Sequence, residues 1–407
     1  MTCRHCRAPL TRTFLDLGHA PPSNAYLGEA ALRAPEITYP LRLMVCDACR
    51  LVQTEDHAAA EALFSADYAY FSSTSRGWLD HAARYAKMIT ERLSLGPQSH
   101  VIEVASNDGY LLRNFVGQGI PCLGIEPTDS TAAAAEAQGI PVLRRFFDED
   151  LGRQLAAEGR AADLVCGNNV YAHVPDINGF TRGLAAVLKP QGVVTLEFPH
   201  LLRMIAECQF DTAYHEHFSY LSLAVVARIF RAAGLRVFDV ERLPTHGGSL
   251  RVYGCLEAAD HTPTDAVAVC LAEEEAAGLL TDAPYAAFQA RADAVKNGLL
   301  SFLLTARAEG RSIAGYGAAA KGNTLLNYAG VKPDLLPFIC DAAPSKQGRF
   351  MPGSHIPILP PAALDDAAPD YLLILPWNIA DEVRANLAHL AARGTRFVTA
   401  IPEVRIA

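Results

Sequence analysis

The sequence predicts an α/β protein in which a small metal-stapled domain precedes two domains built on parallel sheets. At 407 residues the chain is too long for a single ordinary core. Two C-x2-C pairs lie ahead of Arg50, and apolar strand-like runs alternate with helix-like segments in two later blocks. Half of the residues are hydrophobic and 19% are charged, which supplies enough apolar surface for packed cores.

The charge and hydropathy patterns exclude several classes of partner. The formal net charge is −9 and the pI about 5.8, so the chain lacks the basic footprint of a nucleic-acid-binding protein. No apolar run approaches the roughly 18–20 residues that cross a bilayer. The first residues, MTCRHCRAPL, lack the charged and then apolar pattern of a signal peptide. We therefore expect a cytoplasmic protein with no nucleic-acid or membrane partner, in which disulfides are disfavoured.

Four cysteines form two knuckles, Cys3/Cys6 and Cys46/Cys49. A C-x2-C knuckle turns two thiolates toward one point, and two knuckles complete a tetrahedral shell that leaves no open position. The pattern predicts a structural zinc ion, which would staple a segment of modest apolar content. Four unligated thiols remain the alternative, and a redox pair is less favoured because neither knuckle opens a helix after a strand. His5 and His57 are spare candidates for ligands, and the six scattered cysteines are expected to be buried apolar residues.

The expected organisation follows the chain in five segments. Residues 1–57 form the zinc-binding domain, and residues 58–97 a helical linker whose helix is DHAARYAKMITERL. Within 98–258, buried strands are expected at HVIEVAS, PCLGIEP, ADLVCGNN, GVVTLEF and LRVFDVERL, and THGGSLRVYGCLE is expected to close the series as a strand pair. Residues 259–310 form a helical connector. Residues 311–407 repeat the alternation, with strands at RSIAGYG, LLPFICD, DYLLILPW and TRFVTAIPEV and a helix at KGNTLLNYAG.

A polar turn, EVASNDG at 103–109, joins the first of these strands to its helix. In open α/β sheets ligands bind at the carboxyl ends of strands, where Gly109 would permit close approach of the backbone and the helix would offer free N–H groups. Glu126 ends the second strand, where a carboxylate can accept both hydroxyls of a ribose. Because the turn is acidic and lacks G-x-G-x-x-G, it favours S-adenosylmethionine over NAD. A dinucleotide enzyme and a packing role remain open.

Two further segments carry candidate site residues. The segment 168–173, NNVYAH, follows a later strand, so Asn168 or Asn169 is expected near the cofactor and His173 near the substrate, unless the segment only caps a helix. The segment 211–220, DTAYHEHFSY, places titratable residues between aromatic ones. A histidine beside a carboxylate is a candidate general base. A metal site is less favoured, because H-E-H does not place two histidines on one helical face, and a surface helix start is the remaining alternative.

These motifs together resemble the sugar C-methyltransferase family of deoxysugar biosynthesis. The resemblance covers nearly the whole chain and is carried by C-x2-C…C-x2-C, EVASNDG, NNVYAHVPD, YHEHFSY, THGGSLRVY and GYGAAAKGNT, in that order. It implies a zinc domain, a central Rossmann-like methyltransferase domain that uses S-adenosylmethionine, and a C-terminal Rossmann-like domain that closes over the substrate. It also implies a TDP-linked 4-keto-deoxysugar as substrate. Tyr171 is the one motif position at which a smaller aliphatic residue is expected.

The resemblance assigns a role to individual side chains. The catalytic set has His217 as base, with Tyr214, Glu216, His173 and Tyr68, Tyr70 being an alternative to Tyr68. The cofactor set is Glu103, Ser106, Asn107, Asp108, Gly109, Glu126, Pro127, Asn168 and Asn169. The substrate set is His246, Gly247, Arg251, Tyr316, Lys321, Asn323 and Lys346, and the zinc ligands are Cys3, Cys6, Cys46 and Cys49.

This chemistry needs few groups. A carbon attacks a methyl sulfonium as a carbanion, and a sugar carbon becomes acidic next to a ketone. The site then requires a base for that proton and a donor to the developing enolate oxygen. His217 can serve as the base, and Tyr68 or Tyr214 as the donor.

Two rival interpretations stay open. Residues 315–320, GYGAAA, match G-x-G-x-x-A after a strand, and Asp341 ends the next strand, as in an NAD-dependent nucleotide-sugar oxidoreductase. Against it, Lys321 and Asn323 follow at once and, with Lys346, could hold a pyrophosphate already attached to a sugar. The non-enzymatic rival is a zinc-ribbon interaction protein. The sequence leaves open the methylated carbon (C-3 or C-5), the nucleotide, and whether the chain is a monomer or a weak homodimer.

Overall fold

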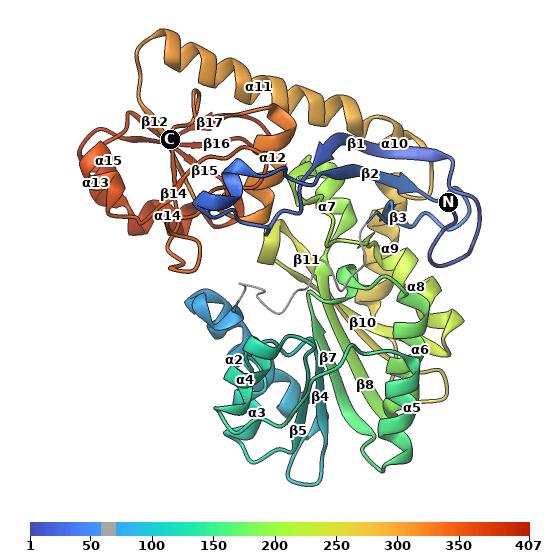
Figure 1. Ribbon diagram of the computed structural model, residues 1–407. Coiled ribbons are helices and arrows are strands. Elements are labelled where there is room, and N and C mark those ends of the chain that lie inside the picture. Colours follow the sequence, from blue (N-terminus) through green and yellow to red (C-terminus); the bar gives the residue numbers. More distant parts are fainter. Residues whose placement is uncertain (58–70) are drawn as a thin grey trace.

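The computed structural model describes residues 1–57 and 71–407, and the chain forms three sheets (Figure 1). Tyr68 and Tyr70 lie outside the described residues. The central sheet occupies the lower half of Figure 1, and the N-terminal and C-terminal sheets lie side by side above it. The candidate site lies where the three parts meet.

The N-terminal sheet has the order β1-β2-β3-β9 and is antiparallel throughout. Its strands are β1 (Arg12–Ala20), β2 (Tyr39–Val45), β3 (Val52–Thr54) and β9 (Ser219–Tyr220), with a short 3₁₀ helix at Glu29–Arg33. The fourth strand comes from the histidine-rich segment of the central region, so residues 1–57 do not complete their own sheet.

The helix expected at 80–93 begins earlier, as α2 (Arg76–Leu93) after a 3₁₀ turn at Ser72–Thr74. Ser75 caps it by accepting a hydrogen bond from the Trp78 backbone N–H, and Ser94 ends it in the left-handed conformation. Its buried face, which includes His81, Tyr85 and Ile89, repeats at helical spacing and packs on the central sheet.

The central sheet has the order β10-β11-β8-β7-β4-β5-β6. Six of its strands run in one direction, and β11 runs antiparallel to them between β8 and β10. Its strands are β4 (Val101–Val104), β5 (Cys122–Ile125), β6 (Val142–Leu143), β7 (Ala162–Asn168), β8 (Leu188–Pro199), β10 (Leu235–Leu243) and β11 (Ser249–Leu256). The chain leaves β4 toward β5 and returns to β7 on the other side, so the topological switch point lies between β4 and β7.

Helices cover both faces of this sheet. α7 (Leu201–Ala206) packs instead in the apolar core of the other two sheets. The helices on the central sheet are α3 (Arg113–Val116), α4 (Asp129–Glu136), α5 (Glu149–Ala157), α6 (Ile177–Val187) and α8 (Leu223–Ala232), and 3₁₀ turns lie at Tyr171–His173 and Phe210–Thr212. Tyr171 is fully buried among them and hydrogen-bonds Thr181 at 2.7 Å. One expectation is wrong. THGGSLRVYGCLE forms a single strand, β11, preceded by a 3₁₀ turn at Thr245–Gly247. It does not fold into a strand pair, because β11 pairs with β8 and β10, which precede it in the chain.

The connector contains α9 (Asp265–Ala276), α10 (Ala283–Ala286) and α11 (Phe288–Ala308). The buried pair Glu274 and His200 connects α9 to the central region. Glu274 accepts hydrogen bonds from the backbone N–H groups of Leu223 and Ala224, at the start of α8, and lies 2.7 Å from His200 Nε2. A carboxylate at a helix N-terminus satisfies N–H groups that have no intrahelical partner.

The C-terminal sheet has the order β14-β13-β12-β15-β16-β17, parallel except for its last strand. Its elements are β12 (Ile313–Tyr316), α12 (Ala320–Ala329), β13 (Ile339–Cys340), β14 (Ile358–Leu359), α13 (Ala363–Ala367), β15 (Tyr371–Ile374), a 3₁₀ turn at Trp377–Ile379, α14 (Ala380–Asn386), α15 (Ala388–Ala392), β16 (Arg396–Thr399) and β17 (Arg405–Ile406). The strand–turn–helix expected around GYGAAAKGNT is therefore β12 and α12.

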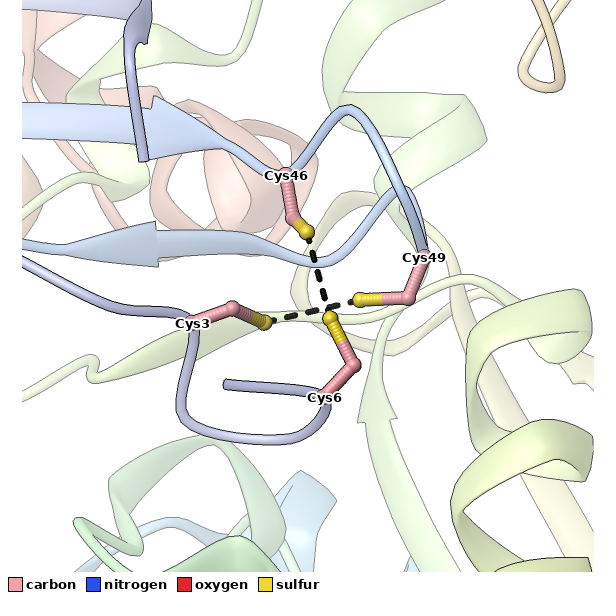
Figure 2. Close-up of side chains that lie close together, drawn as sticks. All are labelled: Cys3, Cys6, Cys46 and Cys49. Carbon is pink, nitrogen blue, oxygen red and sulfur yellow. Dashed lines mark hydrogen bonds between the residues drawn. The ribbon is translucent and has the colours of Figure 1, made fainter. Parts of the chain in front are cut away.

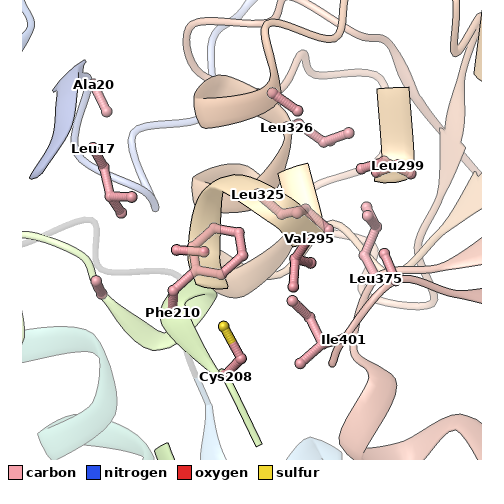
Figure 3. Packing of buried hydrophobic residues seen from close by; sticks show 14 of the residues in the cluster. Leu17, Ala20, Cys208, Phe210, Val295, Leu299, Leu325, Leu326, Leu375 and Ile401 are labelled. Carbon is pink, nitrogen blue, oxygen red and sulfur yellow. The ribbon is translucent and has the colours of Figure 1, made fainter. Parts of the chain in front are cut away.

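One apolar core is shared by the N-terminal and C-terminal sheets. Figure 3 shows side chains of β1, of the segment 208–210, and of α11 and α12 converging on one another. Leu17, Phe210, Leu299 and Leu325 are all buried there. This core fixes the N-terminal sheet against α11 and α12. Among the described helices, none is long and apolar enough to cross a bilayer.

The Glu274 contacts generate a stability prediction. Glu274→Ala should lower the free energy of unfolding by about 3–5 kcal/mol, because it leaves buried His200 and two helix N–H groups without their carboxylate. Urea unfolding would measure the change. Glu275→Ala, one residue along on the exposed face of α9, should leave the midpoint nearly unchanged. Equal midpoints for the two variants would contradict the assignment.

Candidate functional site

The four knuckle cysteines converge on one point (Figure 2). Their sulfur atoms all lie within 4.8 Å of one another, with Cys3–Cys49 and Cys6–Cys46 separations of 3.5 Å. Zn–S bonds of about 2.3 Å require sulfur atoms roughly 3.8 Å apart in a tetrahedron. The hydrogen bond between Cys3 and Cys49 lowers the pKa of the Cys3 thiol and raises that of the Cys49 thiol, so the pair holds a proton that zinc binding would displace. The geometry and the donor set fit the metal. His5 instead hydrogen-bonds Asn178 and His57 contacts Glu55.

The predicted cofactor turn lies at the switch point of the central sheet. Ala105 and Asn107 both have positive φ, 57° and 49°, and Glu126 holds the turn by accepting hydrogen bonds from the backbone N–H groups of Asn107 and Thr128, both at 2.9 Å. Gly109 also has positive φ, and a Cβ there would lie 2.3 Å from the side chain of Ile140. Gly109 is therefore required for packing the turn against its neighbours, and not only for approach of a ligand.

Three carboxyl groups gather around this turn without a basic partner in the described residues. Glu103 is fully buried, and its pKa is raised by burial and by the negative charges of Asp108 and Glu126. Ser106 Oγ, Asp108 Oδ1 and both polar atoms of Asn168 are buried and have no hydrogen-bond partner in the described part of the chain. A cationic, multiply hydrogen-bonding ligand would compensate both the charge and the unpaired atoms. These residues fit S-adenosylmethionine. Pro127 follows Glu126 directly at the same edge.

The histidine loop, residues 211–220, is buried at the junction of the three parts. Its centre is His217, whose Nδ1 lies 2.9 Å from the Thr212 carbonyl oxygen. Since a carbonyl only accepts, Nδ1 carries the proton and Nε2 keeps its lone pair. Burial, with the neighbouring His173, holds the pKa of His217 well below its usual value, so the ring is neutral at pH 7. The loop therefore presents a preformed neutral base.

The predicted catalytic residues that the structure describes lie around His217. The ring of Tyr214 is 3.9 Å from the His217 ring between centroids, and that of His173 is 4.6 Å away. His173 Nδ1 donates to the Glu216 carbonyl oxygen at 2.8 Å, and burial lowers the pKa of His173 to about 4. The Glu216 carboxyl is also buried, which raises its pKa to about 7, and it accepts a hydrogen bond from Asn24. His215 instead packs against Tyr39 of β2.

A second group of predicted residues joins the central and C-terminal parts. Asn169 donates from Nδ2 to His246 Nε2 at 3.1 Å, and Lys321 Nζ lies 3.4 Å from the His246 carbonyl oxygen. Lys321 is held in the first turn of α12, over the ring of Trp377 at 4.6 Å and 3.0 Å from Asn378 Oδ1. Burial lowers the pKa of Lys321 to about 8. An ammonium group is thus kept in a desolvated setting beside the histidines.

The histidine loop supplies an acidic group, Asp211, whose charge acts on Lys321. Asp211 is fully buried and accepts a hydrogen bond from Trp377 Nε1 at 2.7 Å. Burial raises the pKa of Asp211 to about 6, although the positive charge of Lys321 acts to lower it. Gly247 lies under the same indole, where an added Cβ would be 2.3 Å from Trp377. The loop, α12 and the turn at Trp377–Ile379 are therefore fixed to one another.

Three other residues predicted to bind substrate are engaged by the protein or stand apart. The Arg251 guanidinium pairs with Glu197 and Glu241, which favours a structural role. Lys346 Nζ donates to the Ala318 carbonyl and lies 3.3 Å from Asp341. Tyr316 is half-buried at the end of β12, and burial, together with the negative charge of Asp341, raises its pKa.

Asn323, in contrast, is fully buried, and its two side-chain polar atoms have no partner among the described residues. Its side-chain amide can therefore donate to and accept from a bound substrate, as expected for a member of the predicted substrate set.

Sequence reasoning overlooked contributions from the N-terminal segment. Asn24 donates to Glu216 at 2.8 Å, and the Tyr26 hydroxyl donates to the Ala318 carbonyl in the GYGAAA turn at 2.5 Å. Trp377 and Asn378 were also not anticipated. The segment PPSNAYL at 21–27 has no periodicity that marks it, although its Pro-Pro-Ser-Asn composition is typical of a structured turn.

Comparison with known proteins decides the family. Residues 3–64 match the model "Putative zinc binding domain", residues 78–240 match "Methyltransferase domain", and residues 244–402 match "C-methyltransferase C-terminal domain". The chain is 34% identical over 404 residues to the C-methyltransferase NovU of Streptomyces niveus, covering 99% of this chain and 96% of the relative. The chain belongs to the C-methyltransferase family. This C-methyltransferase uses S-adenosylmethionine and binds zinc. The EVASNDG turn fits the cofactor and the cluster of four cysteines fits the metal.

Two further matches cover only part of this chain. An uncharacterized methyltransferase of Mycobacterium leprae is 29% identical over 98 residues, which is 24% of this chain and 36% of that protein. Among solved structures, the 1,6-didemethyltoxoflavin-N1-methyltransferase of Burkholderia thailandensis is 18% identical with a TM-score of 0.38, covering 53% of this chain and 98% of that one.

The cysteine cluster predicts the metal content of the C-methyltransferase. Purified protein should contain about one zinc per chain, and Cys46→Ser should lose most of it, because three thiolates bind zinc far more weakly than four. Metal analysis by mass spectrometry measures both values. Cys122→Ser, at a cysteine far from the cluster in the central sheet, serves as the control and should keep its zinc.

The cofactor turn predicts a binding defect. Glu126→Ala should weaken S-adenosylmethionine binding by about 1–3 kcal/mol, or roughly 5- to 150-fold in Kd, since it removes a charged acceptor that also fixes the turn. Glu126→Gln should lie between wild type and alanine. Isothermal titration calorimetry measures the change, with exposed Glu136→Ala as control. Unaltered affinity in both Glu126 variants would place the ribose elsewhere.

Proposed function

We propose that this C-methyltransferase methylates the carbon next to the ketone of a nucleotide-linked 4-keto-deoxysugar, and that His217 removes the proton from that carbon. The observation that carries the proposal is the His217 imidazole, buried and neutral, with Nδ1 held by the Thr212 carbonyl and Nε2 left as the acceptor. C-methylation requires a carbanion, and a ketone makes the neighbouring carbon acidic enough for an imidazole base.

His217 acts first. Its Nε2 accepts the α-proton, and the resulting imidazolium is stabilised through Nδ1–H by the Thr212 carbonyl oxygen. S-adenosylmethionine, when bound, supplies an electrophilic methyl group on a sulfonium that leaves readily. The transfer step then requires the methyl group to be held in line with the carbanion. The EVASNDG turn and Asn168 would position the cofactor for this step.

The developing enolate oxygen needs a donor, and two described groups lie close to His217. Tyr214 stacks against His217, and Lys321 is a desolvated ammonium held close enough to lower the pKa of His217 by its charge. Glu216, with its pKa raised to about 7, can exchange a proton near neutral pH and return the site to its starting state. Tyr68 stays a predicted donor outside the described residues.

A cavity of about 490 Å³ supports a substrate larger than the sugar alone. It lies between α2, the end of β10 and the start of α14, and its wall includes Trp78, His246 and Asn378. His246 also faces Asn169 and Lys321, so the cavity ends beside the cluster described above. A nucleotide attached to the sugar could extend into this space, where the partly exposed indole of Trp78 offers a stacking surface.

The rival interpretations gain no support. The GYGAAA turn, which suggested NAD, is filled by the protein. The Ala318 backbone N–H donates to the Asp341 carboxylate at 2.7 Å. The Ala318 carbonyl oxygen accepts hydrogen bonds from Tyr26 and Lys346. The full-length C-methyltransferase relative also disfavours a non-enzymatic zinc-ribbon protein. The nucleotide, the methylated carbon, the cytoplasmic location and the monomeric or weakly dimeric state stay predictions.

The base is tested by replacing His217 with Asn. Wild-type protein with S-adenosylhomocysteine and a TDP-4-keto-deoxysugar in D₂O should exchange the α-proton, because deprotonation does not need the methyl group. His217→Asn should slow this exchange by about 10²–10⁴-fold with little change in substrate Kd. NMR of the sugar measures the exchange, and exposed His389→Asn is the matched control.

The pH dependence follows from the same group. Only neutral His217 can accept a proton, and its pKa is lowered by burial, so the exchange rate should stay constant as the pH falls to 6.5 and decline only below it. An acidic limb centred above 6.5, or full exchange in His217→Asn, would assign the base to another residue.

A further inference from the structure

Arg4 lies inside the first zinc knuckle, between two of the metal ligands, yet its side chain extends away from the metal. The guanidinium is buried, with 5% of the side chain exposed. Its Nε donates to the Phe218 carbonyl oxygen at 3.1 Å, and its Nη2 donates to the Thr54 carbonyl oxygen at 2.9 Å. Its Nη1 donates to the Pro175 carbonyl oxygen at 3.2 Å.

The carboxylate of Asp56 accepts the two remaining N–H groups, one from each terminal nitrogen. A guanidinium has five N–H donors in a fixed plane, and all five have acceptors here. Lysine could not reproduce this pattern, because its three donors radiate from one atom. The side chain also lies over the Phe218 ring, 5.0 Å from its centroid.

The three carbonyls belong to segments that surround the proposed base. Phe218 follows His217 in the histidine loop, Pro175 follows His173 by two residues, and Thr54 ends β3. Thr54 in turn donates from its hydroxyl to the His217 carbonyl oxygen at 3.2 Å, and its N–H donates to the Phe218 carbonyl. Arg4 therefore bonds to the backbone on both histidine-bearing segments at once.

The zinc site fixes Arg4 itself. The Arg4 N–H donates to Gln53 Oε1 at 2.9 Å, and Gln53 Nε2 lies 3.3 Å from Cys3 Sγ. Gln53 pairs with Ser219 across the β3–β9 ladder. The second knuckle, which starts where β2 ends, binds the same metal position as the first. The metal thus joins the Arg4 turn to the β2–β3 hairpin on which β9 is seated.

We propose that Arg4 is a positioning residue for methyl transfer, through which the zinc knuckle holds the His173 and His217 segments in register. The proposal rests on the proposed role of His217. It explains why a metal with four thiolate ligands and no open position lies in a C-methyltransferase: its function is to hold in place one guanidinium that binds the site's backbone.

The test uses zinc-loaded full-length protein carrying Arg4→Met, Arg4→Lys or Arg7→Gln. Arg7 is the matched control, since it lies in the same turn with an exposed side chain. Three properties are measured: zinc per chain, amide hydrogen exchange by mass spectrometry, and kcat, KM and Kd for S-adenosylmethionine. The exchange measurement needs no substrate, so it stands even if the proposed sugar is wrong.

Arg4→Met is expected to keep its zinc and its S-adenosylmethionine Kd while kcat falls about 10- to 100-fold, as for a small misplacement of a reacting group. Amides of 216–221 and 173–177 should exchange faster, and those of β4 and β5 should not. Arg4→Lys should recover little of the loss, and Arg7→Gln should match wild type.

Two results would overturn the proposal. One is a zinc-loaded Arg4→Met with wild-type kcat and unchanged exchange in both segments. The other is loss of zinc from both Arg4 variants, since Arg4 would then serve to build the knuckle rather than to connect it to the site.

Discussion

The structure depends on burying a polar loop. Within ten residues Asp211, Glu216 and His217 are removed from water, and each would destabilise the fold if left without partners. The partners come from separate parts of the chain. Asn24 of the N-terminal segment binds Glu216, Trp377 of the C-terminal part binds Asp211, and the loop's own Thr212 binds His217. The three sheets are assembled around the loop because no one of them can satisfy it.

The same arrangement separates charge within the enzyme. The EVASNDG turn concentrates carboxyl groups around Glu103, while the Lys321 ammonium group lies close enough to His217 to lower its pKa. The acidic turn therefore suits the cationic cofactor. Burial keeps the neighbouring histidines uncharged, so they add no positive charge of their own.

Local patterns made much of this predictable. The C-x2-C spacing is enough to indicate paired thiols, and β4, β5 and β7 are mostly apolar runs with polar residues at or just after their carboxyl ends. The failures concern non-local pairing. The two-residue strand β9 has no period of its own, and only its pairing with β3 makes it a strand. The pairing of Arg251, which is expected among the substrate-binding residues, with Glu197 and Glu241 also joins residues that are not neighbours in sequence.

The borrowed strand β9 has a consequence for biosynthesis. β1, β2 and β3 leave the ribosome together with all four cysteines, but β9 follows only after most of the central region has been made. At translation rates of about 5–20 residues per second this delay is on the order of ten seconds. During it the free edge of β3 is a template for pairing with other nascent chains. A metal captured early would hold this unfinished sheet in one arrangement until its last strand arrives.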